Sequence, residues 1–430
     1  LTPRWLIRVE RLAYAQRCST VRHYGCINSK SMAQLRKRLG IMNEQVEKLL
    51  LATSNETFTS IARGVLNDPK ATLAGSQTFS EITTPHNDAR TLGIVKVSGS
   101  ANTPKSGARN WSSVDKVIDL TVPANDAAQW AFPENEPKVY ELGLFADDGL
   151  PFRPAKCYLT QSTGEGLEIL WIEDLSSASQ PPWNLYQFIK TAGHLGKFDG
   201  YHAVHSTVVP IKVAQDAFHL RWAKPDRASN FAKLLNIKDE TATKRIYQNV
   251  PVESAIKLAV IYDRALETAK KIPHSLAFGD SHARNMFPVD SETVGIDWAT
   301  LSNDPIGCDI GVLLGSPVSF TAIESNLIVN HERTIYDSYV AGLESEGWNG
   351  NNDHVRLGFF CQFGGYFTAI GASPTIFEAV ANDEKLRAHY EKRFSAKFDD
   401  IPDQLAEVTA LYPHYTEELE KLIDRVENSL

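Results

Sequence analysis

Residues 274–287 read HSLAFGDSHARNMF, and residues 293–298 read TVGIDW. Two short apolar runs, each typical of a buried strand, lead to Asp280 and Asp297, and a polar loop that contains Asn285 lies between them. The spacing therefore predicts a strand, a loop and a β-hairpin that carry an Asp, an Asn five residues later, and a second Asp at the end of the hairpin.

This set of oxygen ligands suits the transfer of a phosphoryl group. Such a reaction needs a carboxylate that orients the attacking hydroxyl and oxygen ligands that fix Mg²⁺ on the phosphates. Mg²⁺ is held by one or two carboxylates together with phosphate oxygens, so a full protein cage is not required. An Asp followed five residues later by an Asn occurs by chance about once in a chain of this size, so the prediction depends on the linked set.

The motif D-x-H-x-x-N followed by I-D-W resembles the aminoglycoside phosphotransferase and choline kinase-like family, whose members are relatives of protein kinases. The resemblance implies that Asp280 is the catalytic base and that Asn285 and Asp297 bind Mg²⁺. It assigns supporting roles to His282 and Asp309. It further implies ATP as the second cofactor, and a two-lobed, protein-kinase-like fold.

The segment that follows the hairpin extends the resemblance. DPIGCDIG at residues 304–311 is similar to the family's segment after the metal-binding Asp, in which a further Asp, here Asp309, begins the next helix. One position departs from the family pattern. The family usually has a His two residues before the catalytic Asp, and this chain has Phe278 there. That His generally supports the loop, so the departure weakens the inference of activity without removing it.

The first half of the chain contains matching features. TLGIVKV at residues 91–97 places Lys96 inside an apolar strand, where it resembles the lysine that holds the α- and β-phosphates. Glu136 resembles the helix glutamate that pairs with that lysine. Pro137 would put Glu136 in the first helical turn, because Pro is tolerated only there. Glu134 is an alternative partner for the lysine.

Two further segments complete the predicted nucleotide site. Ala-Gly-Ser-Gln around Gly75, between two strand candidates, is interpreted as the turn that covers the phosphates, although it lacks the protein-kinase glycine pattern. The strands at 155–161 and 167–175 resemble the last strands of the family's first lobe. That likeness puts Glu173 at the hinge, where backbone groups contact adenine. Altogether the resemblance covers about residues 70–320.

The change of pattern after Leu175 predicts an α+β fold with a small β-rich first lobe and a larger, mostly helical second lobe. The SSASQPP stretch at 176–182 is the natural boundary. The predicted organisation is a basic N-terminal segment at 1–40, a nucleotide-binding lobe at 41–175, and a catalytic and substrate-binding lobe at 176–430. Helical periodicity covers roughly 41–53, 183–198, 211–235, 253–271, 321–344, 354–371 and 402–429.

The net charge of -8 is unevenly distributed along the chain. Residues 1–40 contain nine basic side chains and one acidic side chain, which leaves 35 basic and 51 acidic side chains in the remainder. An acidic body argues against general nucleic-acid binding, which needs clustered Lys and Arg. It is consistent with a cationic acceptor, although acidic side chains outside the pocket would produce the same total.

Other features bear on location. No run approaches 18 apolar residues, which argues against a membrane span. Five scattered cysteines without a C-x-x-C pair favour a reducing compartment and a cytoplasmic location. The Arg-rich opening resembles a mitochondrial presequence, which is the alternative, and Met32 is a second candidate for the start. The oligomeric state is not predicted.

Three functional hypotheses follow. The first is a phosphotransferase that moves the γ-phosphate of ATP to a hydroxyl of a small molecule, since the chain reaches Asp304 soon after Asp297 without an activation-loop arrangement typical of protein substrates. The second is a pseudokinase-like nucleotide-binding module, suggested by Phe278 and the weak glycine turn. The third is a GDSL-type esterase, because FGDS at 278–281 would make Ser281 a nucleophile, but no D-x-x-H follows to supply its base.

Overall fold

The structure is a computed structural model that describes residues 43–82, 90–122, 131–146, 149–223, 241–320, 322–371, 380, 383–394 and 396–430. The chain divides into two units, Leu1–Ala52 and Thr53–Leu430. In the first unit the described residues form the helix α3 (Glu44–Ala52), within the range for which the periodicity predicts a helix. The predicted basic segment at 1–40 lies outside the described residues.

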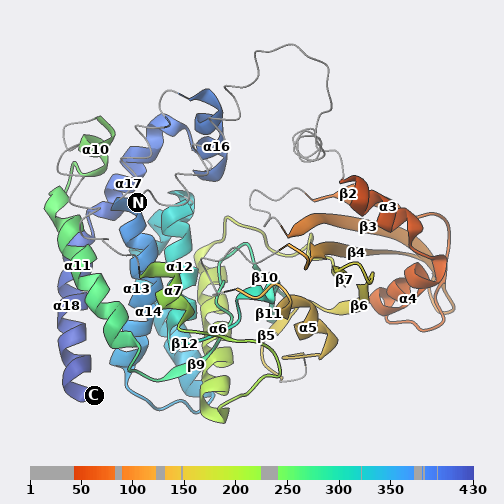
Figure 1. Ribbon diagram of the computed structural model, residues 1–430, viewed down its shortest axis with the longest axis horizontal. Helices are drawn as coiled ribbons and strands as arrows, with labels where there is room; N and C mark the ends of the chain where they lie inside the picture. The colour runs from red at the N-terminus through yellow and green to blue at the C-terminus, as the bar shows by residue number, and fades with distance from the viewer. Residues whose placement is uncertain are drawn as a thin grey trace. The chain divides into compact units, whose positions relative to one another are not determined.

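The first lobe of the second unit is built on one antiparallel sheet (Figure 1). Its strand order is β1-β3-β4-β7-β6, and β2 pairs with β3 beside β1. The strands are β1 (Thr72–Leu73), β2 (Thr78–Glu81), β3 (Thr91–Thr103), β4 (Gly107–Asp119), β6 (Cys157–Ser162) and β7 (Leu167–Glu173). In β3 every second residue is buried around Val95 and Val97, as expected for strands that cover a core.

The two faces of this sheet have different neighbours. On one face the helix α4 (Asn55–Leu66) packs, and the ring of Phe58 meets the ring of Trp171 edge-on at 5.7 Å. On the other face Leu170 and Ile172 of β7 form a buried cluster with Phe287 and Val294, which belong to the hairpin predicted from the sequence. This second cluster joins the sheet to the segment that contains the decisive motif.

That motif forms the predicted strand, loop and hairpin. The strand β9 (His274–Ala277) pairs with β12 (Ser302–Pro305), which also pairs with β8 (Ala214–Gln215). The hairpin consists of β10 (Met286–Val289) and β11 (Glu292–Gly295), and β5 (Phe152–Pro154) pairs in parallel with β11. The short helix α5 (Asn135–Glu141) has Pro137 in its first turn, as predicted.

The second lobe is otherwise helical. The helix α6 (Leu185–His205) begins with a capping box, in which Asn184 and Gln187 each bond the other's backbone. The other described helices are α7 (Ala217–Trp222), α10 (Thr241–Ile246), α11 (Val252–Ala269), α12 (Cys308–Phe320), α13 (Ala322–Ser345), α14 (Asn352–Gly371), α16 (Glu384–Phe394), α17 (Ile401–Thr409) and α18 (Tyr412–Ser429), with the 3-10 turns η1 (Trp298–Thr300) and η2 (Phe398–Asp400). The predicted two-lobed α+β fold is confirmed. In the described parts of the chain no helix combines the length and the apolar character that crossing a membrane requires.

Candidate active site

The loop after β9 presents the carboxylate of Asp280. The chain turns at Gly279, whose φ is +83° and where a Cβ atom would lie 2.2 Å from the carbonyl oxygen of Thr300, so only glycine fits without a shift. Oδ2 of Asp280 accepts a hydrogen bond from Nδ2 of Asn285 at 3.0 Å and lies 3.5 Å from Nε2 of His282. The two residues that the sequence associates with Asp280 therefore meet it in space.

The surroundings of Asp280 keep it ionised. Burial by itself would raise the pKa of this carboxyl, but the charge of His282, the hydrogen bond from it, the guanidinium of Arg221 and the amide of Asn285 together lower it to about 2. At neutral pH the carboxylate is therefore present as an anion, which can accept a hydrogen bond from a hydroxyl group.

Asp309 at the start of α12 holds the backbone of this loop. Its Oδ2 accepts the N–H of Phe278 at 2.7 Å and its Oδ1 accepts the N–H of Gly279 at 2.9 Å. Burial raises the pKa of the Asp309 carboxyl, and these N–H donors counteract the rise. The supporting position that the resemblance gives to Asp309 is thus one of direct contact with the loop.

Phe278 stands where the family usually has a His, and its ring lies in the core. The ring centroid is 4.7 Å from that of Trp298 and 5.4 Å from that of Phe152, both in edge-on geometry. Its carbonyl oxygen accepts a hydrogen bond from Thr300 at 3.1 Å. The loop is therefore held by aromatic packing and by backbone hydrogen bonds at this position.

Ser281 does not have the surroundings of an esterase nucleophile. Its side chain is buried, and its hydroxyl donates to the carbonyl oxygen of Asp309 at 2.7 Å and lies 3.0 Å from Oδ1 of the same residue. A nucleophilic serine needs a base and access to its substrate. The hydroxyl of Ser281 instead braces the loop against α12, so the esterase hypothesis is not supported.

Asp297 follows the hairpin and faces solvent. Its backbone is left-handed, with φ 67° and ψ 59°, a conformation that Asp tolerates better than most residues, and its side chain is 45% exposed. The N–H of Ile296 donates to the carbonyl oxygen of Asn285 at 2.9 Å. This bond brings the Asp280–Asn285 loop beside the strand end that carries Asp297.

A buried ion pair connects the hairpin to the first lobe. Nζ of Lys116 on β4 lies 2.5 Å from Oε2 of Glu136 and 3.2 Å from Oδ1 of Asp297. The other oxygen of Glu136, Oε1, accepts the N–H of Asp297 at 3.0 Å. Burial would lower the pKa of Lys116, but the two carboxylates outweigh burial and raise it, so the side chain remains a cation.

The predicted pairing of Lys96 with Glu136 is wrong. Nζ of Lys96 lies 2.7 Å from Oδ2 of Asp174 and donates to the hydroxyl of Ser176 at 2.8 Å. Lys96 is opposite Val114 in the register of β3 and β4, whereas Lys116 is two residues further along β4 on the same face. Lys96 therefore reaches the segment after β7, and Lys116 reaches α5.

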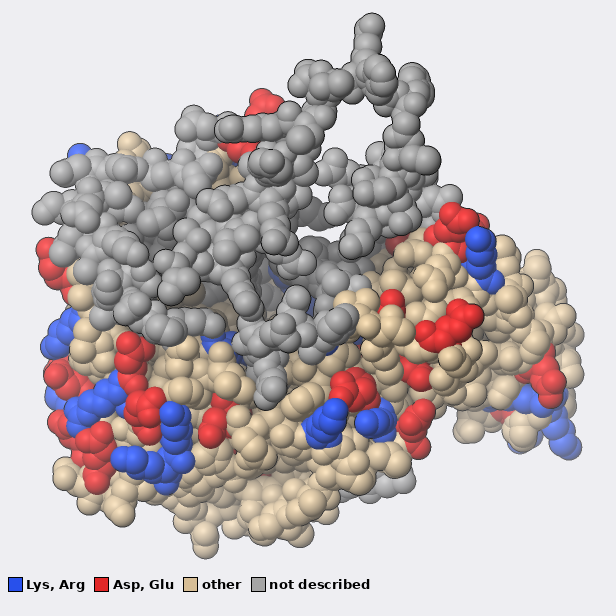
Figure 2. All heavy atoms as spheres, in the orientation of Figure 1, with Lys and Arg blue, Asp and Glu red and all other residues tan. Residues whose placement is uncertain are grey.

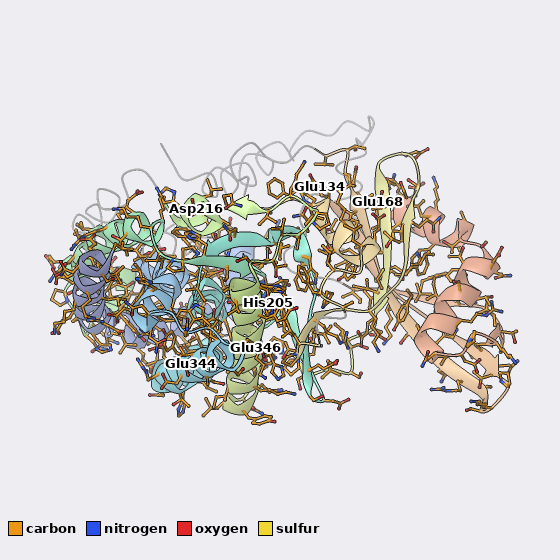
Figure 3. The ribbon with its side chains drawn as sticks, turned by 90° about the horizontal axis from the view of Figure 1, so that it is seen from below. Glu134, Glu168, His205, Asp216, Glu344 and Glu346 are labelled. Atoms are coloured by element: carbon orange, nitrogen blue, oxygen red, sulfur yellow. The ribbon has the colours of Figure 1, made fainter. Side chains whose placement is uncertain are left out.

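Lys116 is the site residue that the sequence reasoning missed. It lies in VDKVID at residues 114–119, a strand with the same alternation as the one that contains Lys96. The alternation shows that both lysines lie in strands, but it does not show which strand reaches α5. Glu134, which is labelled in Figure 3, was the alternative partner of the lysine. Its carboxylate is paired with Nζ of Lys212 at 2.7 Å, so it is also excluded from this set.

Glu173 lies at the end of β7, where the hinge was predicted. Its carboxylate accepts hydrogen bonds from NH1 of Arg153 at 2.9 Å and from the N–H of Lys156 at 3.0 Å. Burial opposes ionisation, but these donors lower the pKa of Glu173. The N–H of Glu173 itself donates to the carbonyl oxygen of Lys156 at 2.8 Å. That N–H is committed within the protein, and an adenine contact by other backbone groups of this segment stays a prediction.

Gly75 lies outside the cluster formed by Lys116, Glu136 and Asp297. It lies between β1 and β2 at an edge of the sheet. Leu73, at the end of β1, is opposite Ala101 of β3, and Thr78, at the start of β2, is opposite Ser98. Lys116 is opposite Ile94, at least four residues away along β3, which corresponds to about 13 Å or more. The segment that joins β2 to β3 contains residues 83–89, which are outside the described residues. The interpretation of Gly75 as a turn over the phosphates stays a prediction.

Arg221 on α7 also approaches Asp280, and no sequence motif predicts it. Its NH2 donates to the carbonyl oxygen of Gly279 at 3.1 Å and lies 3.9 Å from Oδ1 of Asp280. The two residues are far apart in the sequence, and α7 is a helix of six residues within a range predicted as one long helix. The pairing of β8 with β12 brings this segment to the loop.

The donor atoms suit Mg²⁺ and a nucleotide phosphate. Asp297 offers a half-exposed carboxylate, and Asn285, whose Nδ2 bonds Asp280, has Oδ1 as its remaining polar side-chain atom. Hard oxygen ligands are those that Mg²⁺ prefers. Within the described ranges, no group of three or more His, Cys, Asp and Glu side chains is arranged to hold a metal ion. These residues therefore fit a metal that is bound partly by phosphate oxygens.

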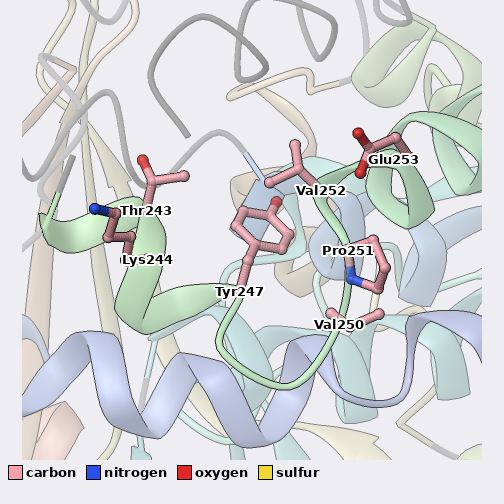
Figure 4. Close-up of a pocket in the computed structure, with 7 residues that line it drawn as sticks. All are labelled: Thr243, Lys244, Tyr247, Val250, Pro251, Val252 and Glu253. Carbon is pink, nitrogen blue, oxygen red and sulfur yellow. The ribbon is translucent and has the colours of Figure 1, made fainter. Parts of the chain in front are cut away.

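One surface hollow lies apart from this cluster. A hollow of about 360 Å³ at the turn between α10 and α11 is lined by Thr243, Lys244, Tyr247, Val250, Pro251, Val252 and Glu253, and none of the site residues lines it (Figure 4). On the face shown in Figure 2, basic and acidic side chains of the described residues are interspersed.

No protein-family model and no curated protein sequence matches this chain. Solved structures that it resembles include a spectinomycin phosphotransferase in complex with ADP and spectinomycin (14% identity, 83% of this chain and 98% of that chain, TM-score 0.44) and a choline kinase from Cryptosporidium parvum Iowa II (11% identity, 86% and 97%, TM-score 0.42). A third is an amicoumacin kinase in complex with AMP-PNP and Ca²⁺ (12% identity, 83% and 96%, TM-score 0.40). These proteins are of the family that the sequence motifs resemble.

Proposed function

We propose that this protein is a phosphotransferase that moves the γ-phosphoryl group of ATP to a hydroxyl of a small molecule. The observation that carries the proposal is one connected set of side chains. Lys116 bridges Glu136 and Asp297, and the backbone bond between Ile296 and Asn285 joins that trio to the loop of Asp280. A cation, a half-exposed carboxylate, a carboxamide and an ionised base are the parts that phosphoryl transfer requires.

The proposed roles follow from the chemistry of each group. Lys116, held by Glu136, binds the α- and β-phosphates, and Asn285 and Asp297 hold Mg²⁺. When bound, the metal neutralises charge on the β- and γ-phosphates. Asp280 orients the acceptor hydroxyl and takes its proton as the new O–P bond forms and ADP departs. These groups are positioned before the reaction by backbone and ion-pair contacts, which is the main protein contribution to this chemistry.

The proposed acceptor is a small molecule. The chain passes from Asp297 to β12 through one 3-10 turn, which leaves no long segment there to bind a protein substrate. The resembling structures include an antibiotic phosphotransferase and a choline kinase. The acidic body favours a cationic acceptor, whereas Arg221 beside Asp280 favours a neutral or anionic one, so both kinds belong in a test.

The test is a screen for ADP formation from Mg-ATP in the presence of hydroxylated metabolites and antibiotics of positive, neutral and negative charge. The Asp280→Asn variant is the matched control, because it preserves the size of the side chain and removes the base. Acceptor-dependent ADP formation that the variant lacks is the expected result. Binding of Mg-ATP without phosphate transfer or slow hydrolysis would instead favour the pseudokinase-like module.

A further inference from the structure

Arg221 has no part in the roles proposed above, yet it lies against the residue that would act as the base. Its side chain is 12% exposed and that of Asp280 is 24% exposed, and the two form an ion pair with 3.9 Å between NH2 and Oδ1. A guanidinium and a carboxylate that are both partly buried are screened less by water than a fully exposed pair. The contact is thus stronger than an exposed pair of the same length.

The two oxygens of Asp280 have different surroundings. Oδ2 is engaged by Asn285 and His282. Oδ1 accepts no hydrogen bond from any residue that the structure describes, and NH2 of Arg221 faces it at a distance longer than a hydrogen bond. A general base needs one oxygen that can accept the proton of the substrate hydroxyl. Oδ1 meets that need. The charge of Arg221 sets the direction of Oδ1 without forming a hydrogen bond to it.

Arg221 also fixes the peptide that precedes Asp280. The same NH2 group donates to the carbonyl oxygen of Gly279 at 3.1 Å, where the backbone is left-handed. On the opposite side of that peptide, the N–H of Gly279 is held by Asp309. The backbone entering Asp280 is therefore restrained from two elements, α7 and α12, so the direction of the carboxylate depends on both.

The short helix that carries Arg221 is anchored on each side of it. The N–H of Phe218 donates to Oδ1 of Asp304 on β12 at 3.4 Å, and Nε1 of Trp222 donates to Oε1 of Gln362 on α14 at 2.7 Å. These bonds hold the guanidinium in place without relying on Asp280, which is what a positioning group requires.

From this geometry we propose that Arg221 is a positioning residue for the phosphoryl transfer, which holds the Asp280 carboxylate with Oδ1 directed to the acceptor hydroxyl. The inference rests on the proposed function. It extends the site to α7, a segment outside the motif at 274–298. It predicts that loss of Arg221 reduces the rate of the chemical step and leaves nucleotide binding unchanged, because no described contact joins Arg221 to Lys116, Glu136 or Asp297.

The experiment compares Arg221→Ala and Arg221→Lys with the wild type and with Arg356→Ala. Arg356 is a matched control because it is another buried arginine, paired with Glu332 and Glu418 between helices. ADP formation is measured with Mg-ATP alone, where water is the acceptor, and with any acceptor from the screen. We expect Arg221→Ala to lower kcat roughly 100-fold with the KM for ATP unchanged. Arg221→Lys, or added guanidinium ion with Arg221→Ala, should restore part of the rate.

Arg356→Ala should lower Tm and leave the kcat of the folded protein unchanged. Equal kcat for Arg221→Ala and wild type would overturn the inference. A loss that neither guanidinium nor Arg221→Lys restores would overturn it too, because such a loss is structural. If the wild type forms no ADP under any condition, the proposed function fails and this inference fails with it. An active wild type with an equally active Arg221→Ala rejects the inference alone.

Discussion

Nζ of Lys116 lies within hydrogen-bond distance of both Glu136 and Asp297, at 2.5 Å and 3.2 Å. One cation on a strand of the sheet thus joins a helix of the first lobe to the end of the hairpin of the second. Because Glu136 also accepts the N–H of Asp297, the two lobes share a small network in which each member has two contacts. Loss of one member leaves buried charge without compensation, which costs more than the loss of a surface pair.

The two lysines of this face give the first prediction. Lys116→Met should lower kcat/KM for ATP roughly 100-fold or more, because it removes both the phosphate-binding charge and the partner of Glu136. Lys96→Met should have a small effect, since Lys96 contacts Asp174 and Ser176 instead. Steady-state kinetics of ADP formation on both variants is the measurement. A larger loss for Lys96→Met would return the nucleotide-binding role to that residue.

Asp280→Asn should abolish phosphate transfer while leaving nucleotide binding close to that of the wild type. The amide cannot take the proton of the acceptor hydroxyl. In the structure Asp280 contacts its own loop and Arg221, and it has no contact with the Lys116 cluster among the described residues. Calorimetry with Mg-AMP-PNP and a transfer assay on the same preparation test both parts. Normal turnover by the variant would show that another group is the base.

Asp297→Asn should weaken the binding of nucleotide in the presence of Mg²⁺ more than in its absence. The substitution removes the carboxylate of the proposed metal site and retains the side-chain shape. Asp290→Asn is a matched control, because Asp290 lies in the same hairpin, also has a positive φ, and is not in the site. Mg²⁺ titrations of nucleotide affinity compare the two variants. An equal Mg²⁺ dependence in both would contradict the assignment.

The free energy of unfolding should depend on pH through Asp304. Burial raises the pKa of this carboxyl to about 7, against the opposing effects of Ser302 and Arg221. Between about pH 4 and pH 7 the native state keeps a proton that the unfolded chain has lost, so its contribution to stability falls as pH rises, by up to about 1.4 kcal/mol per pH unit. Asp304→Asn is neutral throughout. Its stability relative to wild type should therefore increase from about pH 4 to about pH 7 in denaturant titrations and level off above that range. A constant difference would show that Asp304 does not titrate in this range.

Gly279→Ala should reduce both stability and activity. The residue has a positive φ, and a Cβ atom would meet the carbonyl oxygen of Thr300 at 2.2 Å, so the loop of Asp280 must move. Gly107→Ala is the control, because Gly107 also has a positive φ but has no atom near its Cβ position. The control should lose about 1 kcal/mol of stability, because alanine disfavours a positive φ. Gly279→Ala should lose more stability than the control and should also lose transfer activity. Equal effects on Tm and kcat in the two variants would contradict the steric argument.

The sequence predicts the second-lobe part of this site better than the first-lobe part. Asp280, Asn285 and Asp297 lie within one short stretch, so their local spacing almost determines their geometry. Lys116 and Glu136 come from different elements, and only strand register decides which lysine reaches the helix. Periodicity cannot supply register between strands, and Lys96 was therefore an equally good candidate on sequence alone.

Helix boundaries show the same limit. The predicted helix at 402–429 is divided into α17 and α18, with Pro413 in the first turn of the second helix. The range predicted as helical at 211–235 contains β8 and the short α7, because β8 pairs with β12 and Asp216 takes a left-handed conformation before α7. Arg221 could not be found from the sequence for this reason. Its place beside Asp280 is a product of tertiary pairing.

Phe278 anchors the loop of Asp280 through a side chain that does not titrate. A histidine at this position would place an ionisable ring in the core, whereas the rings of Phe278, Trp298 and Phe152 meet only through apolar contact. Apolar contacts weaken on cooling, since the hydrophobic driving force is largely entropic near room temperature. The alignment of the loop should therefore be sensitive to low temperature, and the transfer rate should fall more steeply in the cold than the chemistry alone requires.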